Sequence, residues 1–214
     1  MSTLVPPRIG VCDYGVGNLR SVERAIAHGG GEAVISSDAG ELAACDGLVL
    51  PGVGAFAIAA RALRSRGLDA AIRGVAGSGR PILGVCLGFQ LLFSDSDEGD
   101  GDYGLDLLPG RVRRLHPLVG KVPHMGWNRL SIIRASSLLA GVEDGAHAYF
   151  VHSYAATPDD AATVVAVTDH GGEIVAAVEA GNIAGTQFHP EKSGPAGLRV
   201  YANFVSRCTA PVRA

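Results

Sequence analysis

Cys86 lies in the segment 84–88, Gly-Val-Cys-Leu-Gly, which is the cysteine counterpart of the turn that presents a nucleophile between a strand and a helix. The glycines allow a strained turn and a close approach of the flanking backbones. A helix beginning at Leu87 would direct free N–H groups and the positive end of its dipole at the thiol, which stabilises the thiolate. The pattern predicts a cysteine that attacks a carbonyl carbon, with the Leu87 N–H as an oxyanion donor.

The other three cysteines, Cys12, Cys45 and Cys208, are interpreted as small buried side chains, which is the common state of a cysteine. No two cysteines have the C-x-x-C spacing of a zinc site, and their scatter does not indicate a disulfide framework. We therefore expect a reduced, cytoplasmic protein that needs no metal and no cofactor. A buried structural cysteine is also the alternative for Cys86, and its flanking glycines disfavour it.

A cysteine nucleophile needs a base and a group that orients this base. His189 has the best setting of the 7 histidines, in the segment 185–192, Gly-Thr-Gln-Phe-His-Pro-Glu-Lys. Pro190 biases His189 toward an extended backbone, on which residues two apart face the same way, so Glu191 could reach the imidazole ring. These residues predict a Cys–His–Glu triad. By itself, the His-Pro-Glu segment could be an ordinary surface turn.

A second glycine turn, Pro51-Gly52-Val53-Gly54, follows the apolar segment 47–50. Parallel strands place their carboxyl ends on one edge of a sheet, where ligands bind in open α/β folds. The glycines of this turn would allow a backbone N–H to face a developing oxyanion. The alternative is an ordinary connection between a strand and a helix.

Short apolar runs and helical patterns alternate in the first half of the chain, and short strands dominate the second half. Strands are predicted over 9–12, 33–35, 47–50, 81–85, 111–115, 129–133, 148–151, 163–168, 174–178 and 182–188. Helices are predicted from Leu19 to the glycines 29–31, and over 56–76, 87–93 and 197–206. This order predicts one α/β domain over 1–214, with an open, mostly parallel, flavodoxin-like sheet, helices on both faces and extra antiparallel strands.

The composition excludes several classes of protein. The 214 residues carry a net charge of −3 and are 47% hydrophobic, which does not suit a disordered chain or a basic nucleic-acid binder. We see no secretory signal, and no segment approaches the roughly 20 apolar residues that cross a membrane. The acidic segment 94–102 is predicted to be a solvated surface loop, and the tail 209–214 is predicted to fray.

The predicted site residues belong to a set of motifs that runs through the chain in order. These motifs are 13–19 (DYGVGNL), 51–56 (PGVGAF), 83–90 (LGVCLGFQ), 121–128 (KVPHMGWN), 149–154 (YFVHSY) and 187–193 (QFHPEKS). Together they resemble the class I (triad) glutamine amidotransferases. The first and fourth motifs resemble, more narrowly, the glutaminase subunits of imidazole glycerol phosphate synthases, which act in histidine biosynthesis.

The resemblance implies a reaction. Cys86 would attack the side-chain amide of glutamine, release ammonia and leave a glutamyl thioester that water hydrolyses to glutamate. The ammonia would pass to a cyclase barrel subunit, the heterodimer partner, which makes imidazole glycerol phosphate and aminoimidazole carboxamide ribonucleotide. The free glutaminase would be nearly silent, because a peptide of the turn 51–54 would have to rotate before its N–H faces the oxyanion.

The resemblance also implies roles for further residues. Substrate-binding and oxyanion roles fall on Gly52, Val53, Gly54, Leu87, Gln90 and the backbone of Ser153 and Tyr154. Asn18, Trp127 and Lys192 would face the partner, although Trp127 could instead belong to the core and Lys192 could be a solvated charge. The acidic loop 95–102 is longer than the family pattern leads us to expect, so its contacts are left open.

Three alternatives remain at this stage. A dinucleotide-binding domain would use Gly15, Gly17 and an acidic residue about 20 residues further on, Asp38, but Arg20 occupies the third glycine position. A different triad amidotransferase would share the triad and lack the Pro-His-x-Gly-Trp-Asn motif. A catalytically inactive relative is disfavoured because all three triad residue types are present.

Overall fold

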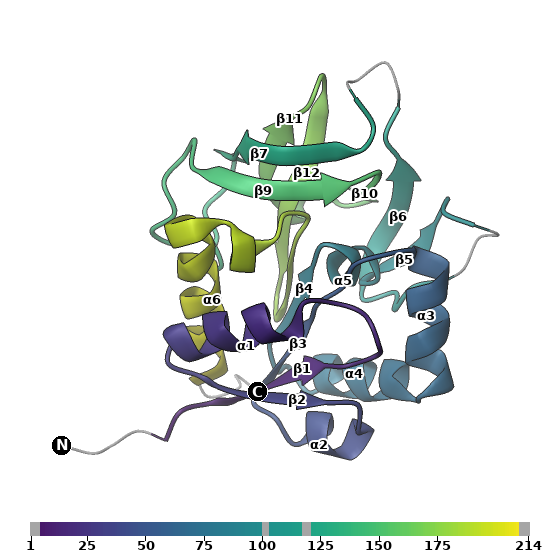
Figure 1. Ribbon diagram of the computed structural model, residues 1–214, viewed down its shortest axis with the longest axis vertical. Helices are drawn as coiled ribbons and strands as arrows, with labels where there is room; N and C mark the ends of the chain where they lie inside the picture. The colour runs from purple at the N-terminus through teal and green to yellow at the C-terminus, as the bar shows by residue number, and fades with distance from the viewer. Residues whose placement is uncertain (1–4, 100–102, 117–120, 210–214) are drawn as a thin grey trace.

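An eight-stranded sheet forms the centre of the computed structural model, which describes residues 5–99, 103–116 and 121–209 (Figure 1). Five neighbouring strands are parallel: β2 (Glu32–Ser36), β1 (Arg8–Cys12), β3 (Gly47–Leu50), β4 (Ile82–Val85) and β13 (Ile183–Thr186). Three antiparallel strands extend the sheet: β12 (Glu173–Ala180), β11 (Val164–Asp169) and β8 (Ser131–Ile132). The parallel part has the strand order of flavodoxin-like sheets, so the predicted fold class is confirmed.

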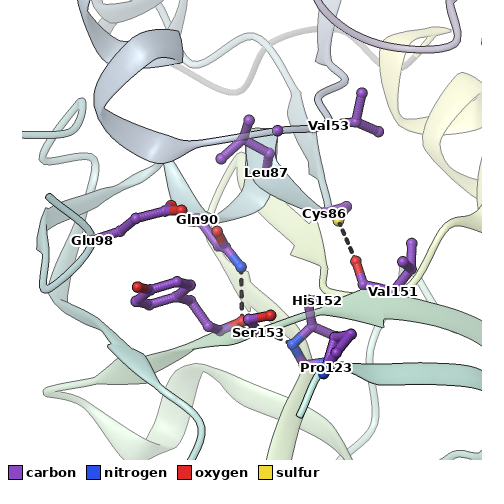
Figure 2. A pocket seen from close by; sticks show the side chains of 11 residues that line it. Val53, Cys86, Leu87, Gln90, Glu98, Pro123, Val151, His152 and Ser153 are labelled. Carbon is purple, nitrogen blue, oxygen red and sulfur yellow. Dashed lines mark hydrogen bonds between the residues drawn. The ribbon is translucent and has the colours of Figure 1, made fainter.

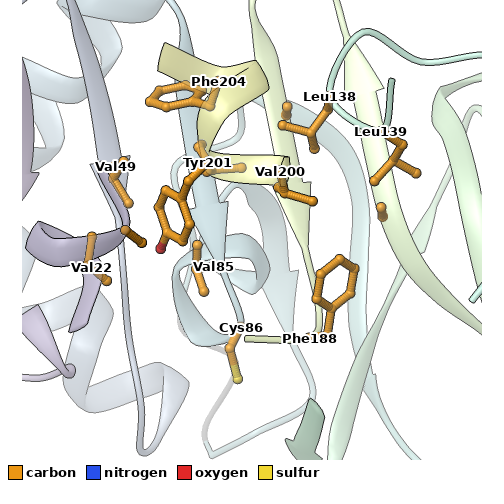
Figure 3. Packing of buried hydrophobic residues seen from close by; sticks show 14 of the residues in the cluster. Val22, Val49, Val85, Cys86, Leu138, Leu139, Phe188, Val200, Tyr201 and Phe204 are labelled. Atoms are coloured by element: carbon orange, nitrogen blue, oxygen red, sulfur yellow. The ribbon is translucent and has the colours of Figure 1, made fainter. Parts of the chain in front are cut away.

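Helices cover both faces of this sheet because its central strands are apolar on both sides. Every residue of β3, β4 and β13 is buried. On one face pack α1 (Leu19–His28) and α6 (Gly194–Thr209), whose Val200, Tyr201 and Phe204 lie over Val49 and Val85 (Figure 3). On the other face pack α2 (Ala39–Ala43), α3 (Phe56–Ser65) and α4 (Leu68–Gly77). The two cores hold the carboxyl ends of the parallel strands at one edge.

Two smaller sheets lie at this edge (Figure 1). One consists of β5 (Phe93–Ser96), β6 (Leu108–Arg114) and β10 (Tyr154–Pro158). The other is an antiparallel pair of β7 (His124–Arg129) and β9 (His147–His152), in which Trp127 is opposite Tyr149. Short helical turns in the described part of the chain are α5 (Leu87–Gln90), η2 (Ala161–Thr163) and η3 (Pro190–Lys192).

Several predicted boundaries were wrong, for local reasons. The helix predicted over 56–76 is two helices, α3 and α4, because Gly67 between them adopts a left-handed φ of 67°. The helix predicted over 87–93 ends at Gln90, since Phe93 already belongs to β5. The strand predicted over 129–133 is divided between the end of β7 and β8, and α2 and β10 were not predicted.

The acidic segment 94–102 is also not wholly a loop. Its first residues continue β5, where Asp95 forms an ion pair with Arg111 of β6 at 3.2 Å. Residues 100–102 of this segment and residues 210–214 of the predicted tail lie outside the described residues.

Candidate active site

Cys86 occupies the turn between β4 and α5 with a backbone conformation that non-glycine residues rarely adopt. Its φ is 53° and its ψ is −108°, and its side chain is 5% exposed. Its N–H donates to the Thr186 carbonyl of β13 at 2.8 Å, and its carbonyl accepts from the Gln90 N–H at 3.1 Å. A strained residue persists when its surroundings fix it, and this position points the thiol into a cavity.

The flanking glycines are required by close contacts. A Cβ on Gly88 would lie 1.7 Å from the Leu50 carbonyl oxygen, and a Cβ on Gly84 would lie 2.7 Å from the Phe89 Cα. These contacts confirm the predicted strand–turn–helix at Cys86. The helix itself is only one turn long, so fewer peptide dipoles act on the thiol than the sequence led us to expect.

His189 and Glu191 form a buried ion pair behind Cys86. The distance from His189 Nδ1 to Glu191 Oε1 is 2.7 Å, and each side chain is 3% exposed. The predicted contact is confirmed, but its route differs from the prediction. His189 is extended, with φ −94° and ψ 98°, whereas Glu191 reaches the ring from the 3₁₀ turn η3.

The environment of His189 favours its charged form. Burial lowers the pKa of His189, but its interactions with Cys86 and Glu191 outweigh this effect and raise the pKa to about 9. Its Nε2 is buried and makes no hydrogen bond of standard geometry within the described part of the chain. A cationic ring oriented by a carboxylate at Nδ1 therefore has its second nitrogen available on the side of the thiol.

The turn at 51–54 is anchored from below. The buried Tyr14 hydroxyl donates to the Pro51 carbonyl at 2.5 Å. A Cβ on Gly52 would lie 2.4 Å from this hydroxyl and 3.0 Å from the Gly88 N, so the turn packs directly on the Cys86 elbow. Gly54 has a φ of 105°, and Val53 is 42% exposed. The turn thus combines a fixed start with an exposed end.

The thiol opens into a cavity of about 400 Å³ (Figure 2). Its lining residues come from the elbow, the 51–54 turn, the segment after β5, the residue before β7 and the β9–β10 junction. They are Val53, Gly54, Cys86, Leu87, Gln90, Glu98, Pro123, Val151, His152, Ser153 and Tyr154. Of the substrate-binding residues that we predicted, only Gly52 does not line the cavity, because it is buried where the turn packs on the Cys86 elbow. The tertiary structure therefore brings residues of separate sequence motifs together around one cavity.

Glu98 and His152 line this cavity and were not predicted. Glu98 lies in the segment predicted to be solvated, and its Oε2 accepts from the Phe56 N–H at the start of α3, at 2.8 Å. No local pattern distinguishes Glu98 from the other acidic residues near it. His152 lies in the motif 149–154, and the partners of its ring become visible only in three dimensions.

Gln187 is the third residue that sequence reasoning missed. Its Nε2 lies 3.8 Å from Cys86 Sγ, and its Oε1 accepts from Gln90 Nε2 at 3.1 Å. Gln90 Nε2 also donates to the Tyr154 carbonyl at 2.9 Å. Because a carbonyl oxygen can only accept, these contacts fix the orientation of the Gln90 amide and leave its Oε1 for a ligand. Membership of the motif 187–193 was the one available signal for Gln187.

The three residues predicted to face a partner are exposed. Trp127 is 58% exposed, so the alternative that it belongs to the core is wrong. Its ring contacts Tyr149 edge-on at 6.0 Å, and Lys192 Nζ lies 5.6 Å from the same tyrosine ring. Asn18, at the start of α1, is exposed and donates to Ser21 Oγ at 2.8 Å.

The fold and the cysteine elbow are those of a class I glutamine amidotransferase. The family model described as glutamine amidotransferase class-I matches residues 11–208, so the chain belongs to this family. This membership overturns the dinucleotide-binding alternative. Solved structures support the fold alone: a glutamine amidotransferase, at 20% identity and a TM-score of 0.75, covers 94% of this chain and 99% of its own. The PurLQS structure from Thermotoga maritima, at 21% identity and a TM-score of 0.71, covers the same shares.

Curated relatives specify the branch of the family. The chain is 54% identical to the imidazole glycerol phosphate synthase subunit HisH of Methanothermobacter thermautotrophicus, over 92% of this chain and 97% of the relative. It is 50% identical to the HisH subunit of Moorella thermoacetica, over 92% of this chain and 93% of the relative. Within the class I amidotransferases, the chain therefore belongs to the HisH family. No helix in the described ranges is long and apolar enough to cross a membrane.

Proposed function

We propose that this chain hydrolyses glutamine as the glutaminase subunit of an imidazole glycerol phosphate synthase, with Cys86, His189 and Glu191 as its catalytic triad. The main observation behind the proposal is the strained Cys86 elbow, which lines the cavity and lies in front of the buried His189–Glu191 pair. The HisH relatives, which share about half of its residues, support the assignment to histidine biosynthesis.

In the proposed reaction, the Cys86 thiolate attacks the carboxamide carbon of glutamine. The oxyanion that forms accepts hydrogen bonds from the Leu87 N–H and from an N–H of the turn 52–54. The C–N bond then breaks, His189 Nε2 gives its proton to the leaving nitrogen, and ammonia departs. A water molecule that passes a proton to His189 hydrolyses the thioester, which releases glutamate and restores Cys86. Glu191 holds the ring and its charge throughout.

The cavity offers groups that match the other end of glutamine. The Glu98 carboxylate is suited to the α-ammonium group, since a carboxylate only accepts hydrogen bonds and carries the opposite charge. Gln90 Oε1 can accept from a substrate N–H because its Nε2 is fully occupied by the protein. The backbone of Ser153 and Tyr154 supplies the opposite wall.

We further propose that a cyclase barrel subunit covers the exposed surface formed by Met125, Trp127, Tyr149, Lys192 and Asn18. Met125 is 63% exposed and Trp127 is 58% exposed, and large apolar side chains that are rimmed by a lysine suit a protein interface. Lys192 follows Glu191 directly, so this surface adjoins the triad. A partner at this place could receive ammonia without its release to the solvent. The four cysteines, all free, agree with a cytoplasmic enzyme.

The test is to purify the chain with the cyclase barrel subunit of the same source and to measure glutamate production with and without the cyclase's nucleotide ligand. We expect slow hydrolysis by the chain alone and much faster hydrolysis in the ligand-bound complex. Cys86→Ala should abolish glutamate production in the complex while the far-UV circular dichroism spectrum and the complex are retained. Undiminished glutamate production by Cys86→Ala would overturn the proposed mechanism.

A further inference from the structure

Three histidines that are not part of the triad gather beside the cavity. His124 of β7 and His152 of β9 are 3% and 6% exposed, and the His170 ring stacks on His124 with centroids 4.1 Å apart. Figure 2 shows the His152 ring at the cavity wall, next to Ser153. Buried imidazoles need hydrogen-bond partners for both nitrogens, so their proton positions can be worked out from those partners.

The direction of each hydrogen bond follows from the Tyr154 carbonyl, the backbone group at one end of this series of contacts. His152 Nδ1 lies 2.8 Å from the Tyr154 carbonyl, which can only accept, so Nδ1 carries a proton. In a neutral ring His152 Nε2 must then accept, and its partner at 3.0 Å is His124 Nδ1. His124 Nε2 must in turn accept, and its partner at 3.2 Å is Asn128 Nδ2.

The Asn128 end is fixed independently. Asn128 Nδ2 also lies 2.7 Å from the Asp169 carbonyl, and Asn128 Oδ1 accepts from the Arg129 N–H at 2.8 Å. Both contacts require the amide orientation that donates to His124. The order Asn128 to His124 to His152 to the Tyr154 carbonyl is therefore consistent from both ends.

Both rings of this chain of hydrogen bonds are neutral at physiological pH. Burial lowers the pKa of His152 to about 3 and the pKa of His124 to about 4, and the charge of His170 acts on both rings in the same direction. His189 adds to the effect on His152. A proton added to either ring would place two donors opposite each other. The lone pairs of His124 Nε2 and His152 Nε2 are occupied, which leaves neither nitrogen for a metal ion.

This chain of hydrogen bonds ends at the Tyr154 carbonyl, next to the Ser153 carbonyl, which accepts from the Leu115 N–H at 2.9 Å. Strand β9 ends at His152 in the two-stranded sheet, and β10 begins at Tyr154 in the three-stranded sheet. Ser153 therefore lies at a junction between two sheets. The Tyr154 carbonyl is held here by two side chains, His152 and Gln90, both of which line the cavity.

We propose that Asn128, His124 and His152 form a directional, neutral hydrogen-bond chain that holds the Ser153–Tyr154 backbone in the position that binds glutamine. His124 and His152 are then positioning residues for the substrate. This inference rests on the proposed glutaminase function. It predicts that loss of this hydrogen-bond chain raises the KM for glutamine and leaves the chemistry at Cys86 largely intact.

The first measurement uses the full chain labelled with ¹⁵N-histidine and needs no activity. Two-bond ¹H–¹⁵N spectra between pH 5 and pH 8 should show His124 and His152 as neutral rings protonated at Nδ1, which is the less common tautomer of free histidine. Either ring found protonated at Nε2, or titrating near pH 6.5, would overturn the proposed chain.

The second measurement compares two nearly isosteric variants in complex with the cyclase subunit. His124→Asn keeps an N–H close to the place of Nδ1, whereas His124→Leu removes it and lets His152 change its tautomer. We expect His124→Leu to raise the glutamine KM about tenfold and to change kcat less than about twofold, because the loss falls on a substrate-binding hydrogen bond. His124→Asn should stay within about threefold of the wild-type KM.

His147→Leu is the matched control, since His147 is an exposed histidine of β9, the strand that pairs with the β7 strand of His124. It should leave the KM unchanged. Equal KM values for wild type, His124→Asn and His124→Leu would contradict the positioning role. A wild-type complex that fails to hydrolyse glutamine would instead contradict the proposed function, and the tautomers measured by NMR would still decide whether the hydrogen-bond chain exists.

Discussion

The two walls of the cavity are built in different ways. The elbow wall consists of residues 84–90, which are neighbours in the sequence and are held by glycines that allow backbones to touch. The opposite wall joins β7, β9 and β10, and its polar contacts link residues such as Asn128 and Asp169 that lie far apart in the chain. The elbow therefore depends on local backbone geometry, whereas the opposite wall depends on a network of buried hydrogen bonds. Substitutions in each wall, and acid, should therefore act on the two walls differently.

His189→Asn should lower kcat for glutamine hydrolysis by about 10⁴, because the proton donor to the leaving ammonia is lost. Steady-state kinetics of the complex with the cyclase would measure the effect. The KM should change little, since His189 does not line the cavity. A decrease in kcat of less than about tenfold would contradict the assignment of His189 as the general acid and base.

The opposite wall should fail in acid. A histidine with a lowered folded pKa stabilises the fold fully above its unfolded pKa of about 6.5, and this contribution is lost as the pH falls toward the folded value. For His124 and His152, whose folded pKa values are about 4 and about 3, the free energy of unfolding should fall by about 2 kcal/mol per histidine between pH 6.5 and pH 5. Urea unfolding of wild type and of the double variant His124→Asn/His152→Asn would measure it.

The double variant should lose most of this pH dependence. His189, whose pKa is raised to about 9, adds little slope in this window, because its folded form stays protonated and its unfolded form, with a pKa of about 6.5, is at least half protonated. Equal slopes in the wild type and in the double variant would show that other groups cause the loss of stability.

Gly88→Ala should break the elbow wall. The new methyl group would lie 1.7 Å from the Leu50 carbonyl oxygen, so α5 or β3 must shift, and we expect a loss of about 3 kcal/mol in the free energy of unfolding. Gly74→Ala in the helix α4 is the control, because a Cβ there meets nothing within 4 Å. It should stabilise the protein by about 0.5 to 1 kcal/mol. Urea unfolding of both variants gives the comparison.

Ser193→Ala tests how the two walls are joined. Ser193 Oγ donates to the His189 carbonyl at 2.6 Å and accepts from the Tyr149 N–H of β9 at 3.0 Å. Removal of this hydroxyl should lower the free energy of unfolding by about 1 to 2 kcal/mol. It should also lower kcat about tenfold, because the His189 backbone would lose its hydrogen-bonded link to β9. Thermal unfolding and steady-state kinetics would measure both effects, and Ser193→Thr should restore part of each. An unchanged kcat would show that the triad does not depend on this link.

The sequence predicted the elements whose causes are local. The strands β1, β3, β4 and β13 are short apolar runs bounded by turns, and their type and order were confirmed. We did not predict that the helix over 56–76 is divided, because a single glycine, Gly67, is the sequence feature at the division and a single glycine does not by itself end a helix. Strand β5 was missed because the acidic residue Asp95 reads as solvated until Arg111 is placed beside it.

The same distinction applies to the candidate site. Cys86, His189 and Glu191 were predicted from residue type, spacing and neighbouring glycines or prolines, all of which act within a few residues. Glu98, Gln187 and the ring contacts of His152 were not predicted. Their roles depend on partners from 42 to 101 positions away for Glu98 and Gln187, and on the packing of β7 against β9 for His152. A sequence pattern contains no information about which distant polar group will lie within 3 Å.

The sequence was sufficient to predict the nucleophile elbow, the succession of strands and helices of an α/β domain and the motifs of the amidotransferase family. These features arise from steric limits on a few consecutive residues and from the periodicity of apolar side chains. The folded structure was needed to show that Glu191 reaches His189 from a 3₁₀ turn, that Trp127 is exposed, and that the rings of His124 and His152 are neutral. Burial and hydrogen-bond direction depend on the surroundings of a side chain, which the fold assembles from residues far apart in the sequence.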